Sequence, residues 1–245
     1  MVALHLLDLT LPSPAENLAG DEALLEWCEA GGYSGHGMLR FWEPRQHFVV
    51  LGYANQVRLE VDEEACRARA IPILRRCSGG GSVLQGPGCL NYTLVLPIEG
   101  EPALESISGA NTFIMHRQRE ALAPLVGENV SVQGHTDLAL GGRKISGNSQ
   151  RRKRRWVLFH GTFLLGLDLA LMAEVLLPPP KPPAYRLNRP HLEFLARLAL
   201  PPARIKAALQ AAWNAFEPLP GVPQPLIEQL VAEKYSRAEW NYRWV

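Results

Sequence analysis

The sequence of 245 residues lacks long apolar runs and lacks an excess of either charge. No stretch of about 18 consecutive apolar residues occurs, and no basic segment precedes the short apolar run at the N-terminus. We therefore expect neither a membrane-spanning helix nor an export signal. The 25 basic and 24 acidic side chains leave a net charge of +1. A charge this small gives no global attraction for nucleic acid or for an anionic membrane, so we expect neither as a partner.

Cysteine is also scarce and shows no metal-binding pattern. Cys28, Cys66, Cys77 and Cys89 form no C-x-x-C pair, and no histidine stands at ligand spacing from them. This spacing argues against a zinc site and is typical of free thiols in a reducing compartment. The sequence therefore predicts a cytoplasmic protein.

The apolar fraction of 47% is ordinary for a globular protein, and the length favours a single domain over residues 1–245. Ser13-Pro14-Ala15-Glu16 is a capping box with proline at the first helical position. It predicts a helix that ends at Gly31-Gly32. Two β-rich runs, 38–42 and 47–53, follow each other closely enough to predict antiparallel pairing.

The rest of the chain mixes β-rich and helical patterns. We predict further strands over 71–75, 82–85, 90–96, 130–133, 138–140, 144–150 and 156–165, and helices over 61–70, 111–125, 191–198, 202–216 and 226–235. Gly141-Gly142 predicts a tight hairpin turn. The proline-rich residues 178–183 predict an extended connector before a helical C-terminal part, 190–240. This order favours an α+β fold with a largely antiparallel sheet flanked by helices.

The most informative motif is Arg75-Arg76-Cys77-Ser78-Gly79-Gly80-Gly81-Ser82-Val83. Three successive glycines leave backbone that a ligand can approach closely and whose amide groups can bind an anion. The two arginines and the first serine add a cationic, hydrogen-bonding rim. No lysine follows the glycines and the G-x-G-x-x-G spacing is absent, which argues against a P-loop and a dinucleotide site. A plain glycine turn is the alternative interpretation.

Together with later motifs, this segment resembles the lipoate-protein ligase A family of the biotin/lipoate protein ligase and octanoyltransferase superfamily. The further motifs are Leu90-Asn91-Tyr92, Gly142-Arg143-Lys144-Ile145-Ser146-Gly147, His160-Gly161-Thr162 and the terminal Lys234-Tyr235-Ser236 with Asn241-Tyr242. Their order matches the family from about residue 36 to 165. The resemblance implies a catalytic domain with the fold of class II aminoacyl-tRNA synthetases and biotin ligases.

The resemblance also implies site residues. Lys144 matches the essential lysine, which binds the carboxylate and the α-phosphate during adenylation; its spacing alone favours a solvated strand lysine. Asp137 is implied to hold Mg²⁺ or to receive the incoming amine, although Thr136 replaces the family's asparagine, and a surface aspartate is the alternative. Asn91 and Tyr92 either orient the acyl carbonyl or cap the sheet. The implied substrate- and nucleotide-binding residues are Arg75, Ser78, Gly79, Gly80, Gly81, Val83, Asn91, Tyr92, Asp137, Ser146, Gly147, His160 and Gly161.

Arg151-Arg152-Lys153-Arg154-Arg155 is the densest run of charge in the chain. Such a run is commonly a solvated turn. Because it follows the strand predicted to carry Lys144, two other interpretations are contact with ATP phosphates and steering of an acidic acceptor domain. The sequence alone leaves these three open.

The cysteine positions bear on the reaction. Octanoyltransferases of this superfamily pass the acyl group through a cysteine thioester near the lysine motif or downstream of it, and this chain has no cysteine after Cys89. We expect Cys77 and Cys89 to be small buried hydrophobes instead. The main prediction is therefore a lipoate-protein ligase that uses lipoate, ATP and Mg²⁺.

The implied acceptors are lysines in lipoyl domains of 2-oxoacid dehydrogenase complexes or in the glycine cleavage H protein. One alternative is octanoyl or lipoyl transfer from acyl carrier protein, and a second is a non-catalytic acyl- or nucleotide-binding partner. The chain stops soon after Asn241-Tyr242 without the C-terminal accessory domain of many such ligases. We expect either a separate accessory protein, or both steps on this chain alone, or a transferase that takes an already activated acyl group.

Overall fold

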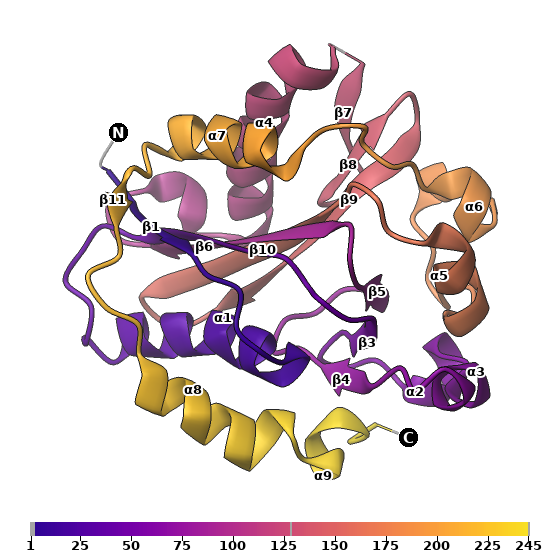
Figure 1. The fold of residues 1–245 in the computed structure, drawn as a ribbon. Coiled ribbons are helices and arrows are strands. Elements are labelled where there is room, and N and C mark those ends of the chain that lie inside the picture. Colours follow the sequence, from indigo (N-terminus) through magenta and orange to yellow (C-terminus); the bar gives the residue numbers. More distant parts are fainter. Residues whose placement is uncertain (1–2, 128, 245) are drawn as a thin grey trace.

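The computed structural model describes residues 3–127 and 129–244, which form a large and a small β-sheet with helices around them (Figure 1). Within these residues the large sheet has the strand order β11-β1-β2-β6-β10-β9-β8-β7 and the small sheet the order β4-β3-β5. The strands are β1 (His5–Asp8), β2 (Met38–Trp42), β3 (Phe48–Leu51), β4 (Ile73–Arg75), β5 (Val83–Gln85), β6 (Cys89–Pro97), β7 (Val130–Gln133), β8 (Asp137–Leu140), β9 (Arg143–Arg152), β10 (Trp156–Leu164) and β11 (Glu217–Pro218). Strand β1 runs parallel to β2 and β11, and β3 runs parallel to β4, whereas the other pairs are antiparallel. The predicted α+β class is confirmed.

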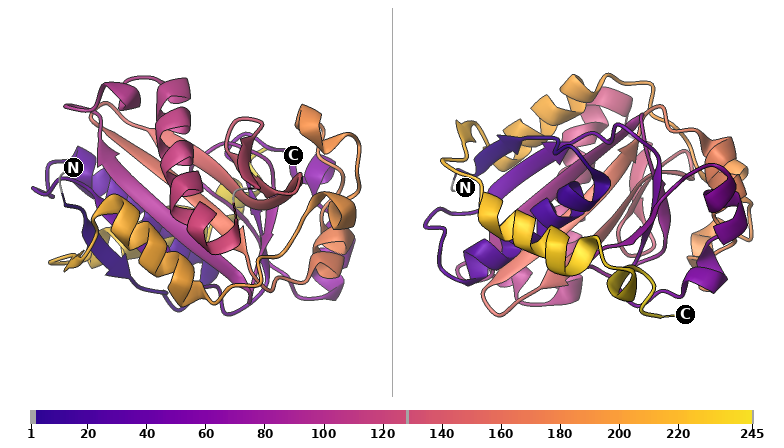
Figure 2. Two further views of the ribbon diagram at one scale, coloured as in Figure 1. Left: turned by 90° about the horizontal axis from the view of Figure 1, so that it is seen from above. Right: turned by 60° about the horizontal axis from the view of Figure 1, so that its bottom comes forward.

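Helices cover both faces of the large sheet. Figure 1 shows α4 and α7 on one face and α1 with α8 on the other, and Figure 2 shows α8 alongside α1. The helices are α1 (Pro14–Glu29), α2 (Val57–Glu60), α3 (Glu63–Ala68), α4 (Ile107–Val126), α5 (Leu169–Val175), α6 (His191–Phe194), α7 (Pro202–Trp213), α8 (Gln224–Leu230) and α9 (Ala238–Asn241). Shorter helical turns occupy Pro102–Leu104, Ala184–Arg186 and Val231–Tyr235. No helix in the described part of the chain is long and apolar enough to cross a membrane.

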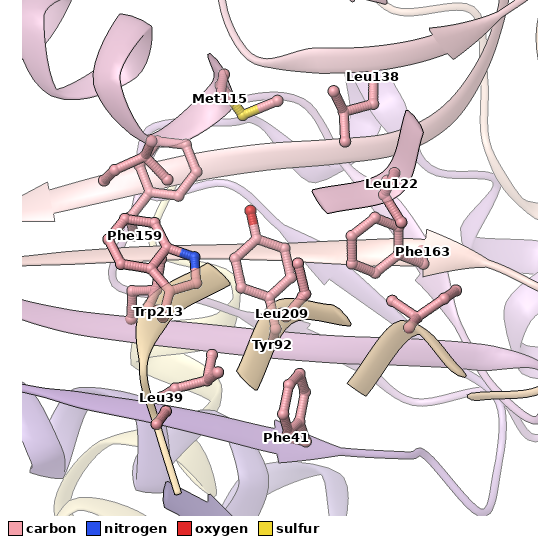
Figure 3. Close-up of a cluster of buried hydrophobic side chains, with 14 of the residues drawn as sticks. Leu39, Phe41, Tyr92, Met115, Leu122, Leu138, Phe159, Phe163, Leu209 and Trp213 are labelled. Carbon is pink, nitrogen blue, oxygen red and sulfur yellow. The ribbon is translucent and has the colours of Figure 1, made fainter. Parts of the chain in front are cut away.

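Alternation along β10 separates the main core from the opposite face of the sheet. Phe159 and Phe163 point toward α4 and α7 and pack with Tyr92, Met115 and Trp213 (Figure 3). Because successive side chains of a strand point to opposite faces, the intervening polar residues of β10 face α1 and the small sheet. The face toward α4 and α7 is therefore core, whereas the face toward α1 combines buried apolar side chains such as Leu158 with the polar side chains of His160 and Thr162.

The predicted capping box, the turn at Gly141-Gly142 and the connector over residues 178–183 are confirmed. Ser13 Oγ accepts a hydrogen bond from the Glu16 N–H at 3.2 Å, and the Glu16 carboxylate accepts one from the Ser13 N–H at 2.7 Å. Gly141 and Gly142 have φ of 57° and 76° and connect β8 to β9 as the predicted turn. Residues 178–183 contain neither helix nor strand, and helices α6, α7 and α8 follow them.

The predicted antiparallel pairing of 38–42 with 47–53 is wrong. Strand β2 lies between β1 and β6, whereas β3 lies in the small sheet. All five residues of β2 are buried, which requires neighbours on both edges and layers on both faces. Strands β1 and β11 and helix α5 were not predicted, because β1 pairs with distant segments and the other two are short.

Candidate active site

Two neighbouring cross-strand rows of residues form the floor of the site. In the first row, Trp42, Asn91, Thr162 and Gly147 are direct partners on β2, β6, β10 and β9. In the second row, Arg40, Thr93, His160 and Ser149 are partners on the same four strands. Residues two apart on a strand share a face, so both rows point toward α1 and the small sheet. Three antiparallel pairings thus bring together residues from four strands.

A cavity of about 670 Å³ lies over this floor. Its volume lies in the range of small-molecule sites. One apolar part of its wall consists of Leu18, Trp42, Val50, Val83 and Leu84. The ionisable side chains on its wall are Asp21, Glu60, Arg76, His135, Asp137, Lys144, His160, Lys181, Arg186 and His191. An apolar compartment next to clustered charge suits a ligand with an apolar chain and an anionic group.

Most of the predicted site residues meet at this cavity. Those on its wall are Gly80, Gly81, Val83, Asn91, Tyr92, Asp137, Lys144, Gly147, His160 and Gly161. Those behind the wall are Arg75, Ser78, Gly79 and Ser146.

Lys144 lies at the start of β9, beside β8, and forms an ion pair with Asp137. The distance between Lys144 Nζ and Asp137 Oδ1 is 2.8 Å, and the two side chains are 24% and 14% exposed. The lysine folds back over Gly147, where an added Cβ would lie 2.7 Å from Nζ. A side chain at position 147 would therefore displace the ammonium group from this place in the cavity wall.

Tyr185 completes this pair and was missed by sequence reasoning. Its hydroxyl donates to Asp137 Oδ2 at 2.8 Å. Burial, together with the neighbouring Asp137 carboxylate, raises the pKa of Tyr185, so the phenol keeps its proton. Tyr185 follows the proline-rich connector, and no local pattern links it to Asp137. We call Lys144, Asp137 and Tyr185 the lysine network.

The predicted magnesium site has one carboxylate candidate. In residues 3–127 and 129–244, no group of three or more His, Cys, Asp or Glu side chains could hold a metal ion. Asp137 already has a partner for each carboxylate oxygen. Mg²⁺ is commonly held by one or two carboxylates plus substrate phosphates and waters. Asp137 therefore fits only as a single ligand next to a bound nucleotide.

Arg76 forms hydrogen bonds to residues 78–81, which we call the glycine segment. Its guanidinium donates to Ser78 Oγ and to the carbonyls of Gly79 and Gly81. Burial lowers the pKa of Arg76 to about 10. Gly80 has φ of +85°, so the segment needs glycine there. The cationic rim predicted from the sequence is formed by this arginine.

Arg75 does not reach the cavity, so its predicted role as a substrate- or nucleotide-binding residue does not fit the structure. Its guanidinium is fully buried and donates to backbone carbonyls of Gly52, Asn55, Trp240 and Asn241. Neighbouring residues of an extended strand point in opposite directions, so Arg75 and Arg76 cannot share one site. Arg75 instead ties the C-terminal segment to the small sheet.

A second polar network joins α1 to the glycine segment. Arg40 Nη1 donates to Asp21 Oδ1 at 2.6 Å, and His160 Nδ1 lies 3.0 Å from Asp21 Oδ2. His160 Nε2 lies 2.6 Å from Ser78 Oγ, which also accepts from Arg76 Nε at 3.0 Å. We call these residues the histidine network. Sequence reasoning missed Asp21, although an acid beside the apolar residues Leu18, Leu24 and Leu25 of the first helix was a signal.

Asn91 and Tyr92 lie on opposite faces of β6. Asn91 hydrogen-bonds with Gln85 at 3.0 Å and accepts from the Thr162 hydroxyl, which joins the small sheet to the floor. Tyr92 donates to Asn148 Oδ1 at 2.7 Å from the main core. An added Cβ at Gly161 would collide with Asn148, so this glycine gives the amide its space.

Asn148 is another residue that sequence reasoning missed. It holds the turn that contains Thr136, the position where the family has asparagine. Thr136 Oγ1 donates to the Asn148 carbonyl at 2.7 Å, and Asn148 Nδ2 donates to the Thr136 carbonyl. Ser146 is fully buried and donates to Asn148 Oδ1 at 3.4 Å. The threonine that replaces asparagine therefore contributes to the turn through its hydroxyl group.

The basic run lies at the far end of β9 from Lys144. Eight residues separate Lys144 from Arg152, or about 26 Å along an extended strand. Arg152 donates to the Leu104 carbonyl at 2.7 Å, Lys153 pairs with Glu26 at 2.6 Å and Arg155 pairs with Glu29 at 4.0 Å. Arg152 and the turn after it lie too far along β9 to reach phosphates beside Lys144. Arg151, however, lies over the ring of Tyr53, whose N–H donates to the Ser78 carbonyl, so the contact with ATP phosphates stays a prediction. Internal partners also weaken the steering interpretation.

The four cysteines are buried, and none of them lines the cavity. Burial raises the pKa of Cys77 and of Cys89 to about 12. A thiol with such a pKa is almost entirely protonated at neutral pH and is a poor nucleophile. The expectation that Cys77 and Cys89 are small buried hydrophobes is confirmed.

Comparison with known proteins places this architecture in a family. The lipoyl protein ligase A/B catalytic domain matches residues 13–193. Octanoyltransferase LipM of Geobacillus kaustophilus is 27% identical over 266 residues, which cover 94% of this chain and 94% of the relative.

Two solved structures share the fold. Lipoate-protein ligase A bound with ATP has a TM-score of 0.80 at 23% identity and covers 99% of this chain and 100% of its own. A bipartite lipoate protein ligase of Thermoplasma acidophilum, described with its E2 lipoyl domain, has a TM-score of 0.80 at 22% identity and covers 100% and 98%. The match over most of the chain, on the same fold, shows that this protein belongs to the lipoyl protein ligase A/B catalytic domain family.

Proposed function

We propose that this protein attaches a lipoyl or octanoyl group to a lysine of a lipoyl domain and that it activates the acyl group with ATP. The observation that carries the ATP-dependent route is the cavity wall, which holds Lys144 and, among the described residues, no thiol. Adenylation needs a cation where negative charge develops and needs no protein nucleophile. The likeness to a ligase bound with ATP supports the same route.

The chemistry follows from the wall. The apolar part, with Trp42 and Val50, takes the acyl chain, and Lys144 faces the carboxylate and the α-phosphate. A carboxylate oxygen attacks the α-phosphate and pyrophosphate leaves, while the ammonium offsets the developing charge. The acceptor amine then attacks the acyl carbonyl and AMP leaves. Mg²⁺ beside Asp137 would supply further positive charge at the phosphates.

Octanoyl transfer from acyl carrier protein is the second candidate. The observation that favours it is the relative named octanoyltransferase LipM, which aligns with nearly the whole chain. A thioester route through Cys77 or Cys89 is disfavoured by their burial and raised pKa. This candidate therefore needs either direct transfer from the donor thioester or another nucleophile.

A choice of acyl donors separates the two candidates. The purified chain is given an apo lipoyl domain with either lipoate or octanoate plus ATP and Mg²⁺, or octanoyl-acyl carrier protein without ATP, and the acceptor mass is measured. We expect modification with the free acids, accompanied by pyrophosphate release. Modification with the thioester alone would instead establish the transferase.

The partner and the cysteines are tested in the same assay. The proposed acceptors are lipoyl domains of 2-oxoacid dehydrogenase complexes or the glycine cleavage H protein. A structural neighbour that is described with an E2 lipoyl domain supports the first of these. Modification of the lipoyl domain by this chain alone would show that the reaction needs no accessory protein. Cys77→Ala and Cys89→Ala variants should keep their activity with ATP, apart from stability losses of about 1–3 kcal/mol.

A further inference from the structure

Arg186 is a buried cation on the cavity wall that the adenylation described above does not use. Its side chain is 6% exposed, and it follows Tyr185, whose hydroxyl group donates to Asp137. After burial, both Arg186 and Lys144 lower the pKa of His191, so the two cations lie near the same ring. Arg186 therefore belongs to the part of the cavity that holds the lysine network.

Arg186 has hydrogen-bonding capacity that the protein leaves unused. Its Nε donates to the Arg189 carbonyl at 2.8 Å, and within residues 3–127 and 129–244 its two terminal nitrogens have no acceptor. Neither of these nitrogens is sealed off from solvent, and Arg186 forms part of the cavity wall. Because almost all of the side chain is buried, the donors that stay accessible are directed into the cavity.

No carboxylate of the described residues balances this charge. Burial lowers the pKa of Arg186, Tyr185 opposes this shift, and Arg189 lowers the pKa again. The carboxylates on the cavity wall all have partners elsewhere: Asp21 binds Arg40 and His160, Asp137 binds Lys144 and Tyr185, and Glu60 binds Asn55 and Ser82. The wall histidines His135 and His191 cannot supply negative charge. A guanidinium stays protonated even when buried, and a buried charge without a partner is costly, so this site lacks an anion.

Arg189 shows how a structural arginine differs in the same place. Both guanidinium groups lie over the ring of Phe194, with Cζ at 4.9 Å from its centroid for Arg186 and at 5.4 Å for Arg189. Arg189 Nε donates to the Arg186 carbonyl, and its Nη2 donates to the carbonyls of Gly142 and Tyr185. Arg189 thus uses its donors to hold the backbone, whereas Arg186 leaves its terminal donors free for a ligand.

We infer that Arg186 binds a phosphate group of the acyl donor, at a second position beside the one that Lys144 faces. The inference rests on the proposed function, which supplies a donor that carries phosphates. A guanidinium fork matches two phosphate oxygens. Lys144, Arg186 and the exposed Lys181 share this wall, and together they exceed the single charge of a carboxylate and suit a polyphosphate.

Two donors could supply this phosphate. In ATP, Lys144 faces the α-phosphate, so Arg186 binds the β- or the γ-phosphate, which leave as pyrophosphate. In octanoyl-acyl carrier protein, the phosphate is the diester of the phosphopantetheine arm that carries the thioester. The chemistry at Arg186 is the same in both cases, and the two sources are separated by the test.

The test is the affinity for ATP, inorganic pyrophosphate and AMP, measured by isothermal titration calorimetry. We expect Arg186→Gln to bind ATP and pyrophosphate about 10- to 100-fold more weakly than wild type, because charge-assisted hydrogen bonds are lost. AMP lacks the β- and γ-phosphates and should bind both proteins alike. Arg189→Gln is the matched control on the same ring, and it should keep the wild-type affinity for ATP.

Arg186→Lys keeps the charge without the fork and should show an intermediate affinity, so it carries the test if Arg186→Gln does not fold. Unchanged ATP affinity with a raised KM for octanoyl-acyl carrier protein would support the site with the carrier arm as the source. No change with either donor, or an equal loss for ATP and AMP, would overturn the inference. Failure of the proposed function would look different: wild type would modify no lipoyl domain, whereas binding of pyrophosphate that depends on Arg186 would still support the site.

Discussion

The two polar networks beside the cavity differ in burial and in origin. The lysine network joins β8, β9 and the segment after the connector, and Lys144 and Asp137 are 24% and 14% exposed. The histidine network joins α1, β2, β10 and the glycine segment, and Arg40 and Asp21 are 1% and 3% exposed. Separating a buried ion pair leaves a charge in a medium of low dielectric constant, whereas water screens a partly exposed pair. The lysine network can therefore rearrange around a substrate, and the histidine network fixes geometry.

The two networks should differ most when the aspartate of each is replaced. Asp21→Ala leaves Arg40 buried without its carboxylate, and we expect a loss of about 3–5 kcal/mol in the free energy of unfolding. Asp137→Ala is the matched control and should cost about 1–2 kcal/mol, because it removes a partly exposed ion pair and the hydrogen bond from Tyr185. Urea unfolding measures both. Similar losses for the two variants would refute the contrast.

The next largest effect concerns rate. Lys144→Ala removes the cation that faces the reacting groups, and we expect adenylate formation to fall by about 10²–10³-fold. Lys153→Ala is the control, because this lysine also pairs with a carboxylate but lies at the far end of β9. Pyrophosphate release reports the rate. Near-normal adenylation in a folded Lys144→Ala protein would remove Lys144 from the chemistry.

The stability at low pH gives a further test of the histidine network. Asp21 has an ordinary pKa of 3.8 and a lower one in the folded protein. Its contribution to stability is therefore complete above the ordinary value and disappears as pH falls through the lower, folded value. We expect the free energy of unfolding of wild type to drop over this range more steeply than that of Asp21→Asn. Parallel curves from about pH 5 to pH 2 would contradict this assignment.

The smallest effect is expected for Tyr185→Phe. The variant removes one hydrogen bond to Asp137 and should cost about 0.5–1.5 kcal/mol in stability. Because Asp137 would keep Lys144 as a partner, adenylation should change less than in Lys144→Ala. A rate as low as that of Lys144→Ala would show that the phenol itself takes part in the reaction.

Local signals in the sequence predicted local structure well. The capping box of α1, the Gly141-Gly142 turn and the two strands around the basic run each depend on residues close in the chain. The pairing of β2 was predicted wrongly, because β6 competes for it from about 50 residues away. Long-range pairing depends on which surfaces are buried together, and periodicity in one segment carries no such information.

The candidate site shows the same division. Lys144 and Asp137 were both predicted as site residues, and the predicted hairpin turn at Gly141-Gly142 joins the strands that bring them together. Arg75 was assigned to the site through its place in a motif, yet the direction of its side chain depends on the C-terminal segment. Tyr185 was missed because only tertiary structure brings it to Asp137.

The sequence by itself determined the α+β class, the family resemblance and the residue types needed for acyl activation. Those features depend on short patterns of glycine, charge and apolar spacing that act within a few residues. Only the tertiary structure decided that Arg76, not Arg75, organises the glycine segment and that no cysteine of the described residues lines the cavity. Burial and hydrogen-bond partners are properties of the packed chain, because they arise where α1, the small sheet and β10 meet.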